Sequence, residues 1–171
     1  MTDQSQPVVP WEAPVEPTGP APGVEFAPHG PRLIAYILDA LIVTALMVAT
    51  GAVFFVLLGA TGGLDEGGPR NPAAFTILAA VWLAVIVTIA FLYFPYFWQR
   101  SGQTPGMMPF RLWVVRDKDG QGFGWGTAFL RVLGMYVASS VFYLGFIWIL
   151  IDKRHRGWQD LIAGTVVIKR P

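Results

Sequence analysis

Three long apolar segments divide the chain. Residues 33–58 contain one charged residue, Asp39; residues 74–98 contain none; and residues 127–151 contain only Arg131. About 20 apolar residues in helical conformation cross the hydrocarbon core of a bilayer, so each segment is long enough to span. The pattern predicts an all-α integral membrane protein. The first two segments form transmembrane helices, and the third hydrophobic segment either spans or re-enters on the side where it started.

Two short segments outside these stretches are rich in β-branched and aromatic residues, which is typical of strands. Residues 110–115 precede a turn signal at residues 117–120, and residues 164–169 lie close to the C-terminus. A single strand is not stable by itself. We therefore expect the two strands to pair in a small cytoplasmic β element, which requires them to lie on the same side of the membrane.

The first 31 residues differ from the rest of the chain. Eight of them are proline, and up to residue 31 every charged residue is acidic. Such a segment buries too little apolar surface to compensate its loss of conformational entropy. We predict a disordered Pro-rich N-terminal tail over residues 1–31 and one transmembrane domain over residues 32–170. The tail is a tether or, alternatively, a site that recruits a protein partner.

The basic residues between the apolar segments test the topology. With three full spans, five Lys and Arg residues would lie on one side and six on the other, which is nearly a tie. If the third segment re-enters instead, ten lie on one side and one on the other, and basic residues favour the cytoplasmic side. This favours a re-entrant hairpin or an in-plane helix pair, with a bend near Ser139 and Ser140 and both termini in the cytoplasm.

The overall composition excludes several classes of function. Only 13% of the residues are charged, whereas soluble domains carry about a quarter. The formal net charge of +1 gives no support to nucleic-acid binding. The absence of cysteine excludes disulfides and thiolate ligands, and His29 and His155 lack the spacing of metal ligands. We expect no enzymatic activity, no cofactor and no metal, and the lipid bilayer is the expected partner.

Asp39 is the most informative residue, because it is an acid within an apolar segment. A carboxylate near the centre of a span costs about 2.5 kcal/mol or more, and less near the ends. Asp39 is therefore interpreted either as a proton- or ion-binding group or as a polar helix–helix contact. In the second case its partner would be Thr44, Arg131 or a second subunit.

Three further charged residues lie at the edges of the apolar segments. Arg32 shares a helix face with Asp39 but lies about 10 Å away along the axis, too far for a direct ion pair. It either anchors the first helix at the interface or pairs with Asp160, which would tie the C-terminal tail to that helix. Arg131 is expected at the membrane interface rather than buried.

Several segments taken together resemble the RDD family of bacterial membrane proteins, named for one arginine and two aspartates. The resemblance begins with Pro31 to Asp39 and continues through Gln103-Thr104-Pro105-Gly106, the strand and turn that follow, and Arg131; it ends with residues 159–167. It implies a location in a bacterial cytoplasmic membrane.

The resemblance also identifies the name-giving residues as Arg32, Asp39 and Asp160, with Asp152 as the alternative for the last. Two positions depart from the family pattern. Met107 replaces the usual lysine after Thr-Pro-Gly, and Gln159 replaces the usual histidine before the last aspartate. Any ion-handling step that depends on those two side chains in relatives is in doubt here.

The family has no settled activity, and cation/proton exchange is among the suggestions for it. Our leading hypothesis is transport of a small ion. The transporter would be a homo-oligomer, because two or three helices enclose little of a path for an ion across the membrane. Asp39 would bind the proton or cation, supported by Arg32, Asp160 and Arg131. The competing hypothesis is a non-transporting membrane scaffold or accessory subunit, in which the charged residues only fix helix packing.

Overall fold

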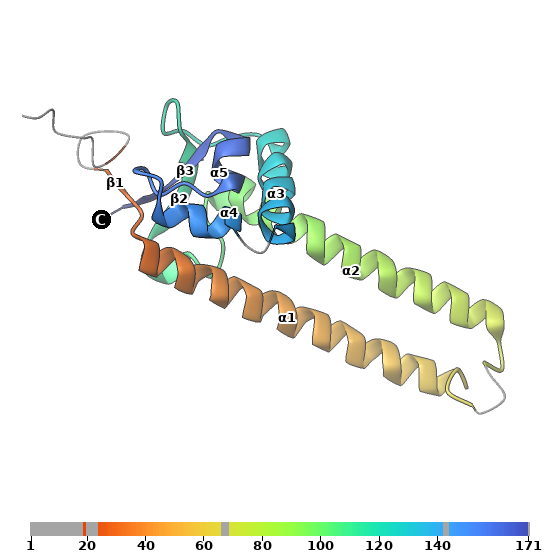
Figure 1. Cartoon of the computed structure of the whole chain (residues 1–171). Helices are drawn as coiled ribbons and strands as arrows, with labels where there is room; N and C mark the ends of the chain where they lie inside the picture. Colours follow the sequence, from red (N-terminus) through yellow and green to blue (C-terminus); the bar gives the residue numbers. More distant parts are fainter. Residues whose placement is uncertain (1–18, 20–23, 66–68, 142–143, 171) are drawn as a thin grey trace, which may run out of the picture.

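Two long helices form an antiparallel hairpin that carries a small folded unit at one end (Figure 1). The computed structural model describes residues 19, 24–65, 69–141 and 144–170, so most of the predicted tail lies outside the described residues. The elements in chain order are β1 (Glu25–Phe26), α1 (His29–Ala60), α2 (Pro72–Ser101), η1 (Met108–Phe110), β2 (Leu112–Arg116), α3 (Trp125–Ser140), α4 (Leu144–Ile147), η2 (Trp148–Leu150), α5 (Trp158–Ala163) and β3 (Thr165–Lys169).

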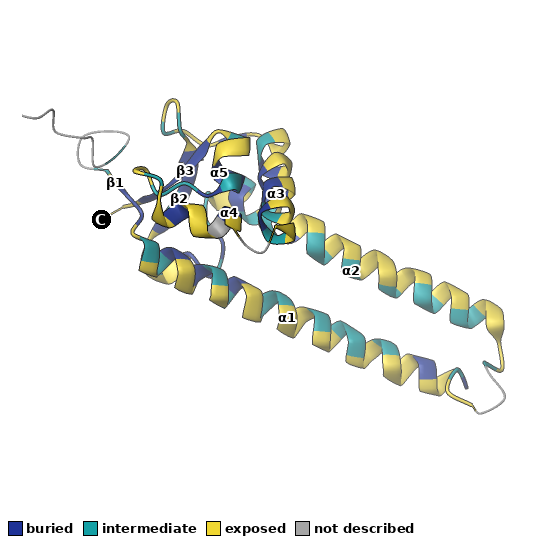
Figure 2. Ribbon diagram, viewed as in Figure 1, coloured by how far each residue is buried: buried dark blue, intermediate teal, exposed yellow. Residues whose placement is uncertain are grey.

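Within the described residues, α1 and α2 are the two helices that are long and apolar enough to cross a membrane, judged by length and composition. At 1.5 Å per residue, their 32 and 30 residues extend for about 48 and 45 Å. Both exceed the hydrocarbon core of a bilayer, which is about 30 Å thick. Away from the folded unit, most side chains of the hairpin are exposed or half-buried (Figure 2). This part of the hairpin therefore has no protein core of its own.

A three-stranded antiparallel sheet joins segments that are far apart in the chain, in the order β1-β3-β2. Leu112 of β2 pairs with Lys169 of β3, and the register continues to Arg116 opposite Thr165. The predicted pairing of residues 110–115 with residues 164–169 is confirmed. The start of the described N-terminal segment, the second connection and the C-terminal segment therefore lie at the same end of the hairpin.

The third apolar segment is bent. It is divided among α3, α4 and η2, and α3 ends at Ser140, where the serine pair predicts a bend. The 16 residues of α3 extend for only about 24 Å, less than the thickness of a bilayer core. The segment packs against α5 and α2, and within the described residues it contains no helix that is long enough to count as a third candidate span. Its outer side still exposes apolar side chains, among them Leu133, Val137 and Leu150.

The folded region begins earlier than the predicted boundary after residue 31. Phe26 and Ala27 are buried, and the backbone N–H of Ala27 donates to the carbonyl of Val167 at 2.9 Å. These two residues pair along β3 on the side opposite β2, which ties the end of the Pro-rich segment to the sheet. The hydrophobic core of the unit lies between this sheet and α3, and includes Leu112, Val114, Val132 and Val167.

Candidate functional site

Four charged side chains within the described residues are almost completely buried: Arg32, Asp39, Arg131 and Asp160, each at most 1% exposed. They are the four residues that the sequence analysis identified. Burial of an unpaired charge costs several kcal/mol, so each requires compensating contacts. The structure supplies these contacts in two places, which we call the arginine brace and the Asp39 lock.

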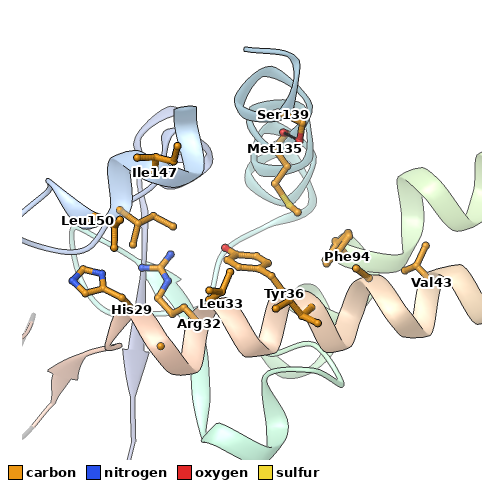
Figure 3. Close-up of a pocket in the computed structure, with 14 residues that line it drawn as sticks. His29, Arg32, Leu33, Tyr36, Val43, Phe94, Met135, Ser139, Ile147 and Leu150 are labelled. Carbon is orange, nitrogen blue, oxygen red and sulfur yellow. Dashed lines mark hydrogen bonds between the residues drawn. The ribbon is translucent and has the colours of Figure 1, made fainter. Parts of the chain in front are cut away.

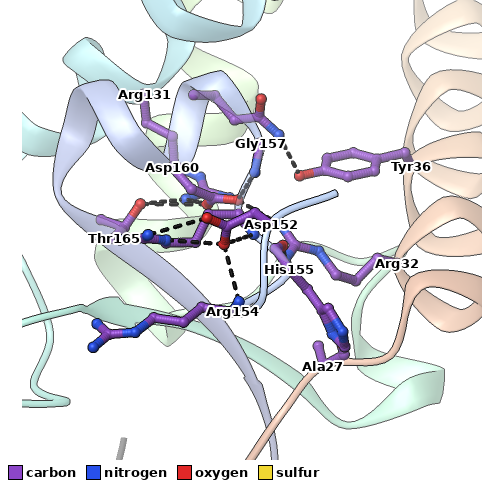
Figure 4. A network of polar contacts seen from close by, with 12 residues as sticks. Ala27, Arg32, Tyr36, Arg131, Asp152, Arg154, His155, Gly157, Asp160 and Thr165 are labelled. Carbon is purple, nitrogen blue, oxygen red and sulfur yellow. Dashed lines mark hydrogen bonds and ion pairs between the residues drawn. The ribbon is translucent and has the colours of Figure 1, made fainter. Parts of the chain in front are cut away.

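The arginine brace consists of Arg32, Arg131 and Asp160 (Figure 4). Arg32 Nη2 lies 2.6 Å from Asp160 Oδ2, and Arg131 Nη1 pairs with Oδ1 of the same carboxylate. The backbone N–H of Gly157 also donates to Asp160 Oδ2, at 3.0 Å. One carboxylate on α5 thus holds one arginine from α1 and one from α3. The predicted pairing of Arg32 with Asp160 is present.

Arg131 is buried inside the protein, so the expectation that it is not buried is wrong. Its level relative to the membrane interface stays a prediction. Its guanidinium group lies over the Trp98 ring, 4.7 Å from the ring centre, and also donates to Thr165 Oγ1. Aromatic faces attract guanidinium groups electrostatically. Trp98 and Asp160 therefore provide within the protein the environment that the sequence analysis assigned to the interface.

The charge state of Asp160 follows from its surroundings. Burial alone would raise the pKa of this carboxyl group, but the positive charges of Arg131 and Arg32 and the hydrogen bonds from Arg32 and Gly157 hold the pKa below its ordinary value of 3.8. Asp160 is therefore ionised at neutral pH. Since two guanidinium groups share one carboxylate, the brace has a net charge of +1.

The Asp39 lock consists of Asp39 and its three hydrogen-bond partners, and it joins α1 to α2 and to the second connection. The partners are Tyr93, Thr104 and Gly106. Asp39 Oδ1 accepts hydrogen bonds from Tyr93 Oη on α2 and from the backbone N–H of Gly106, both at 2.9 Å. Asp39 Oδ2 accepts a hydrogen bond from Thr104 Oγ1. The carboxylate is thus a polar helix–helix contact, but its partners are neither Thr44 nor Arg131, because the second connection passes directly against α1.

Gly106 shows how closely this connection approaches α1. A Cβ atom at residue 106 would lie 2.4 Å from the Ala35 carbonyl oxygen and 2.9 Å from the Asp39 nitrogen. Both neighbours are backbone atoms of a helix and cannot move aside cheaply. Glycine is therefore the residue that allows the loop to reach the Asp39 carboxylate with its own N–H group.

The hydrogen bond between Asp39 and Tyr93 lies at equivalent levels of the two helices. Residues 40–60 of α1 and residues 72–92 of α2 continue beyond it, and each stretch is about 30 Å long. That length matches the hydrocarbon core of a bilayer. Asp39 therefore lies at the base of the hairpin, where the folded unit begins, and not in the middle of a span.

Sequence reasoning missed Tyr93 and Trp98 as site residues, because both fall in an aromatic cluster typical of a headgroup region. The Thr-Pro-Gly segment was identified, but nothing in the sequence showed that it contacts Asp39. Both departures from the family pattern have structural roles. Met107 is 1% exposed in the core, and Gln159 Nε2 donates to Tyr36 Oη at 3.2 Å.

A second polar network lies near the surface and contains Asp152, the alternative candidate for the last name-giving residue. Asp152 pairs with Arg156 at 3.1 Å, and Asp117 pairs with Arg156 and Arg154. Burial would raise the pKa of Asp152, but hydrogen bonds from Arg156 lower it. Asp160, not Asp152, is therefore the partner of Arg32. The described part of the chain holds no group of three or more His, Cys, Asp or Glu residues that could bind a metal.

Comparisons with known proteins identify the family of the chain. The model of the RDD family matches residues 26–164, which contain both the arginine brace and the Asp39 lock. A proline-rich antigen of Mycobacterium leprae (strain TN) is 26% identical over 93 residues, which are 53% of this chain and 37% of that protein. The chain therefore spans well under half the length of this relative. No solved structure matches the chain.

Proposed function

The chain belongs to the RDD family, and on this premise we propose that it is a membrane-anchored scaffold or accessory subunit whose buried charges fix its packing. In this proposal α1 and α2 cross the bacterial cytoplasmic membrane, and the folded unit and both termini lie in the cytoplasm. The two span-length helices and the exposed apolar side chains of the hairpin support this placement.

The observation that carries the proposal is the surroundings of the Asp39 carboxylate. Cation sites in proteins are built from several oxygen ligands that converge on the ion. Asp39 instead faces three donors: the Gly106 N–H and the hydroxyl groups of Tyr93 and Thr104. These hydrogen bonds give both oxygen atoms of the Asp39 side chain partners from within the protein. This arrangement supports a structural carboxylate.

The folded unit gives the scaffold a surface on one side of the membrane. The Pro-rich segment leads directly into β1, which pairs with β3 at the edge of the sheet. Only the end of the segment, at Glu25 to Ala27, is held at the sheet, and in this proposal the tail recruits a protein partner on that side of the membrane. The relative in Mycobacterium leprae is described as proline-rich, which is consistent with a function for such a segment.

Ion transport is the second candidate, and one observation favours it. Tyr93, Asp39 and Thr104 form a continuous line of hydrogen bonds between α2, α1 and the second connection. A carboxylate between two hydroxyl groups can pass a proton. In this candidate the protein acts as a homo-oligomer, because one two-helix hairpin encloses no path.

Flux measurements on purified protein in liposomes distinguish the two candidates. Wild-type protein and the Asp39→Asn variant are reconstituted with a pH-sensitive dye inside, and Na⁺, K⁺ and proton gradients are applied in turn. The scaffold proposal expects both to match protein-free liposomes. Flux in the wild type that disappears in Asp39→Asn would establish transport instead. Circular dichroism of the reconstituted variant tests whether a loss of flux is caused by a loss of fold. Tyr93→Phe separately tests whether a proton passes along the hydrogen bonds between Tyr93, Asp39 and Thr104.

A further inference from the structure

A cavity of about 740 Å³ lies between α1 on one side and α3 and η2 on the other (Figure 3). Its volume falls within the range of about 300–1,000 Å³ that is typical of small-molecule sites. Most of its lining is apolar and comes from all three elements, including Leu33, Ile37, Met135 and Ile149. An apolar body of this size fits a hydrocarbon chain.

The two ends of the cavity differ in chemistry. Figure 3 shows Arg32 and His29 at one end and Val43 and Phe94 towards the other. Arg32 is only 1% exposed, and its two terminal nitrogens donate to the His155 carbonyl and to Asp160. Its Nε atom has no hydrogen-bond partner among the described residues, and the same holds for Nδ1 of His29. A buried guanidinium N–H such as that of Arg32 usually has an acceptor, and the imidazole nitrogen of His29 donates or accepts according to its tautomer. The polar end therefore lacks an acceptor that a ligand can supply.

The charge of the arginine brace points to the sign of that ligand. Arg32 and Arg131 share the single carboxylate of Asp160, so one positive charge next to the cavity is uncompensated. Both arginines are paired with Asp160, but a net positive charge inside the protein favours an anion nearby. The ligand that fits has an anionic group at the Arg32 end and an apolar chain that runs towards Phe94.

The position of the cavity identifies the source of such a ligand. Its α1 residues run from His29 to Val43, and so they extend across the level of Asp39 where the folded unit meets the hairpin. In the membrane placement proposed above, this is the level of the lipid headgroups. We propose that the cavity binds an anionic phospholipid, with its phosphate at Arg32 and His29 and one acyl chain between α1 and α3.

Photo-crosslinking of lipids to the full-length protein in liposomes tests this site. The probes are phosphatidylglycerol and phosphatidylcholine that carry a photoreactive group on one acyl chain, and mass spectrometry maps the modified peptides. Ala40 lines the cavity, so Ala40→Trp fills it. Ala45→Trp is the matched control, because Ala45 is exposed on the same helix and lies outside the cavity lining. His29→Glu places a negative charge at the polar end.

We expect phosphatidylglycerol to label cavity peptides in preference to phosphatidylcholine. Ala40→Trp should lower this labelling about tenfold, while Ala45→Trp leaves it within about twofold, since only the first removes the binding volume. His29→Glu should abolish the preference for the anionic lipid. Labelling spread evenly along both helices, or insensitivity to Ala40→Trp, would overturn the proposal, as would crosslinking of the cavity to a second copy of the chain. Flotation of the same liposomes tests membrane placement independently, so failure of the site and failure of the proposed function are distinguishable.

Discussion

Asp160 is the residue on which the arginine brace depends. It belongs to a helix of only six residues, yet it contacts side chains from α1 and α3 and the backbone at the start of its own helix. Removal of either arginine leaves the carboxylate only one guanidinium partner. Removal of the carboxylate leaves two buried guanidinium groups without the counter-charge that they share.

Replacement of Asp160 by asparagine should therefore strongly destabilise the protein. Loss of one partner from a buried ion pair costs about 3–5 kcal/mol, and the repulsion between Arg32 and Arg131 adds to this. Denaturation of the detergent-solubilised protein, followed by circular dichroism, measures the effect. Asp65→Asn is the control, because the Asp65–Arg70 pair is exposed and such pairs contribute less than about 1 kcal/mol. Equal stability of the two variants would show that the brace is not a stabilising element.

The pH dependence of stability should carry the signature of Asp160. Because its pKa is lower in the folded protein than its ordinary value of 3.8, its contribution is complete above about pH 4. The contribution is lost as the pH falls through the lower folded-state pKa. The contribution of Asp160 to the melting temperature of the wild type should thus be constant from pH 5 to 8. The melting temperature should fall steeply in more acidic solution. In Asp160→Asn the melting temperature should fall less steeply with decreasing pH than it does in the wild type. Equal slopes in the two proteins would contradict the assignment of this pH dependence to Asp160.

At the residue level, the sequence was informative about Arg32 and Asp160, because both were expected to lie at one interface if the C-terminal segment returned to its starting side. The partners of Asp39 were not predictable. Tyr93 comes from the opposite helix, and Thr104 and Gly106 come from a polar connection whose path depends on tertiary packing. Arg131 was misplaced for the same reason, since its contacts with Trp98 and Asp160 are long-range.

At the scale of elements, the second connection determines how the hairpin is held at its base. The loop from Gly102 to Met107 links the end of α2 to β2, and it also packs against α1 through the Asp39 lock. Local patterns predicted the helices and strands on either side of this loop. The bend in the third segment was predictable from charge and from the pairing of β2 with β3, because a third span would separate the strands.

Gly106→Ala should disrupt this loop. The added Cβ would overlap the backbone of α1 at Ala35 and Asp39, and overpacking of this kind costs about 1–3 kcal/mol or more. Gly122→Ala provides the matched control in the same connection, because a Cβ there has no neighbour within 4 Å. Thermal melting in detergent should show a lower midpoint for Gly106→Ala and little change for Gly122→Ala. If both variants lower the midpoint by the same small amount, the loop accommodates the added Cβ and the hydrogen bonds to Asp39 persist.

For the whole molecule, the decisive feature is that the sheet gathers segments from before α1, after α2 and the C-terminal end of the chain at the base of one hairpin. This arrangement requires an even number of membrane crossings between any two of these segments. The connection between α1 and α2 lies at the far end of the hairpin, about 45 Å of helix away.

Single cysteines test this topology without background, because the chain contains none. Leu64→Cys, in the α1–α2 connection, should react with a membrane-impermeant maleimide added outside intact cells. Lys118→Cys and Lys169→Cys, in the turn after β2 and at the end of β3, should react only after the membrane is permeabilised, since the paired strands share one side. Lysates labelled in detergent control for the intrinsic reactivity of each site. External labelling at Lys169→Cys together with protection at Lys118→Cys would require a third span between the strands. The β2–β3 ladder could then not form, so this one outcome would refute the arrangement of the folded unit as well as the orientation of the hairpin.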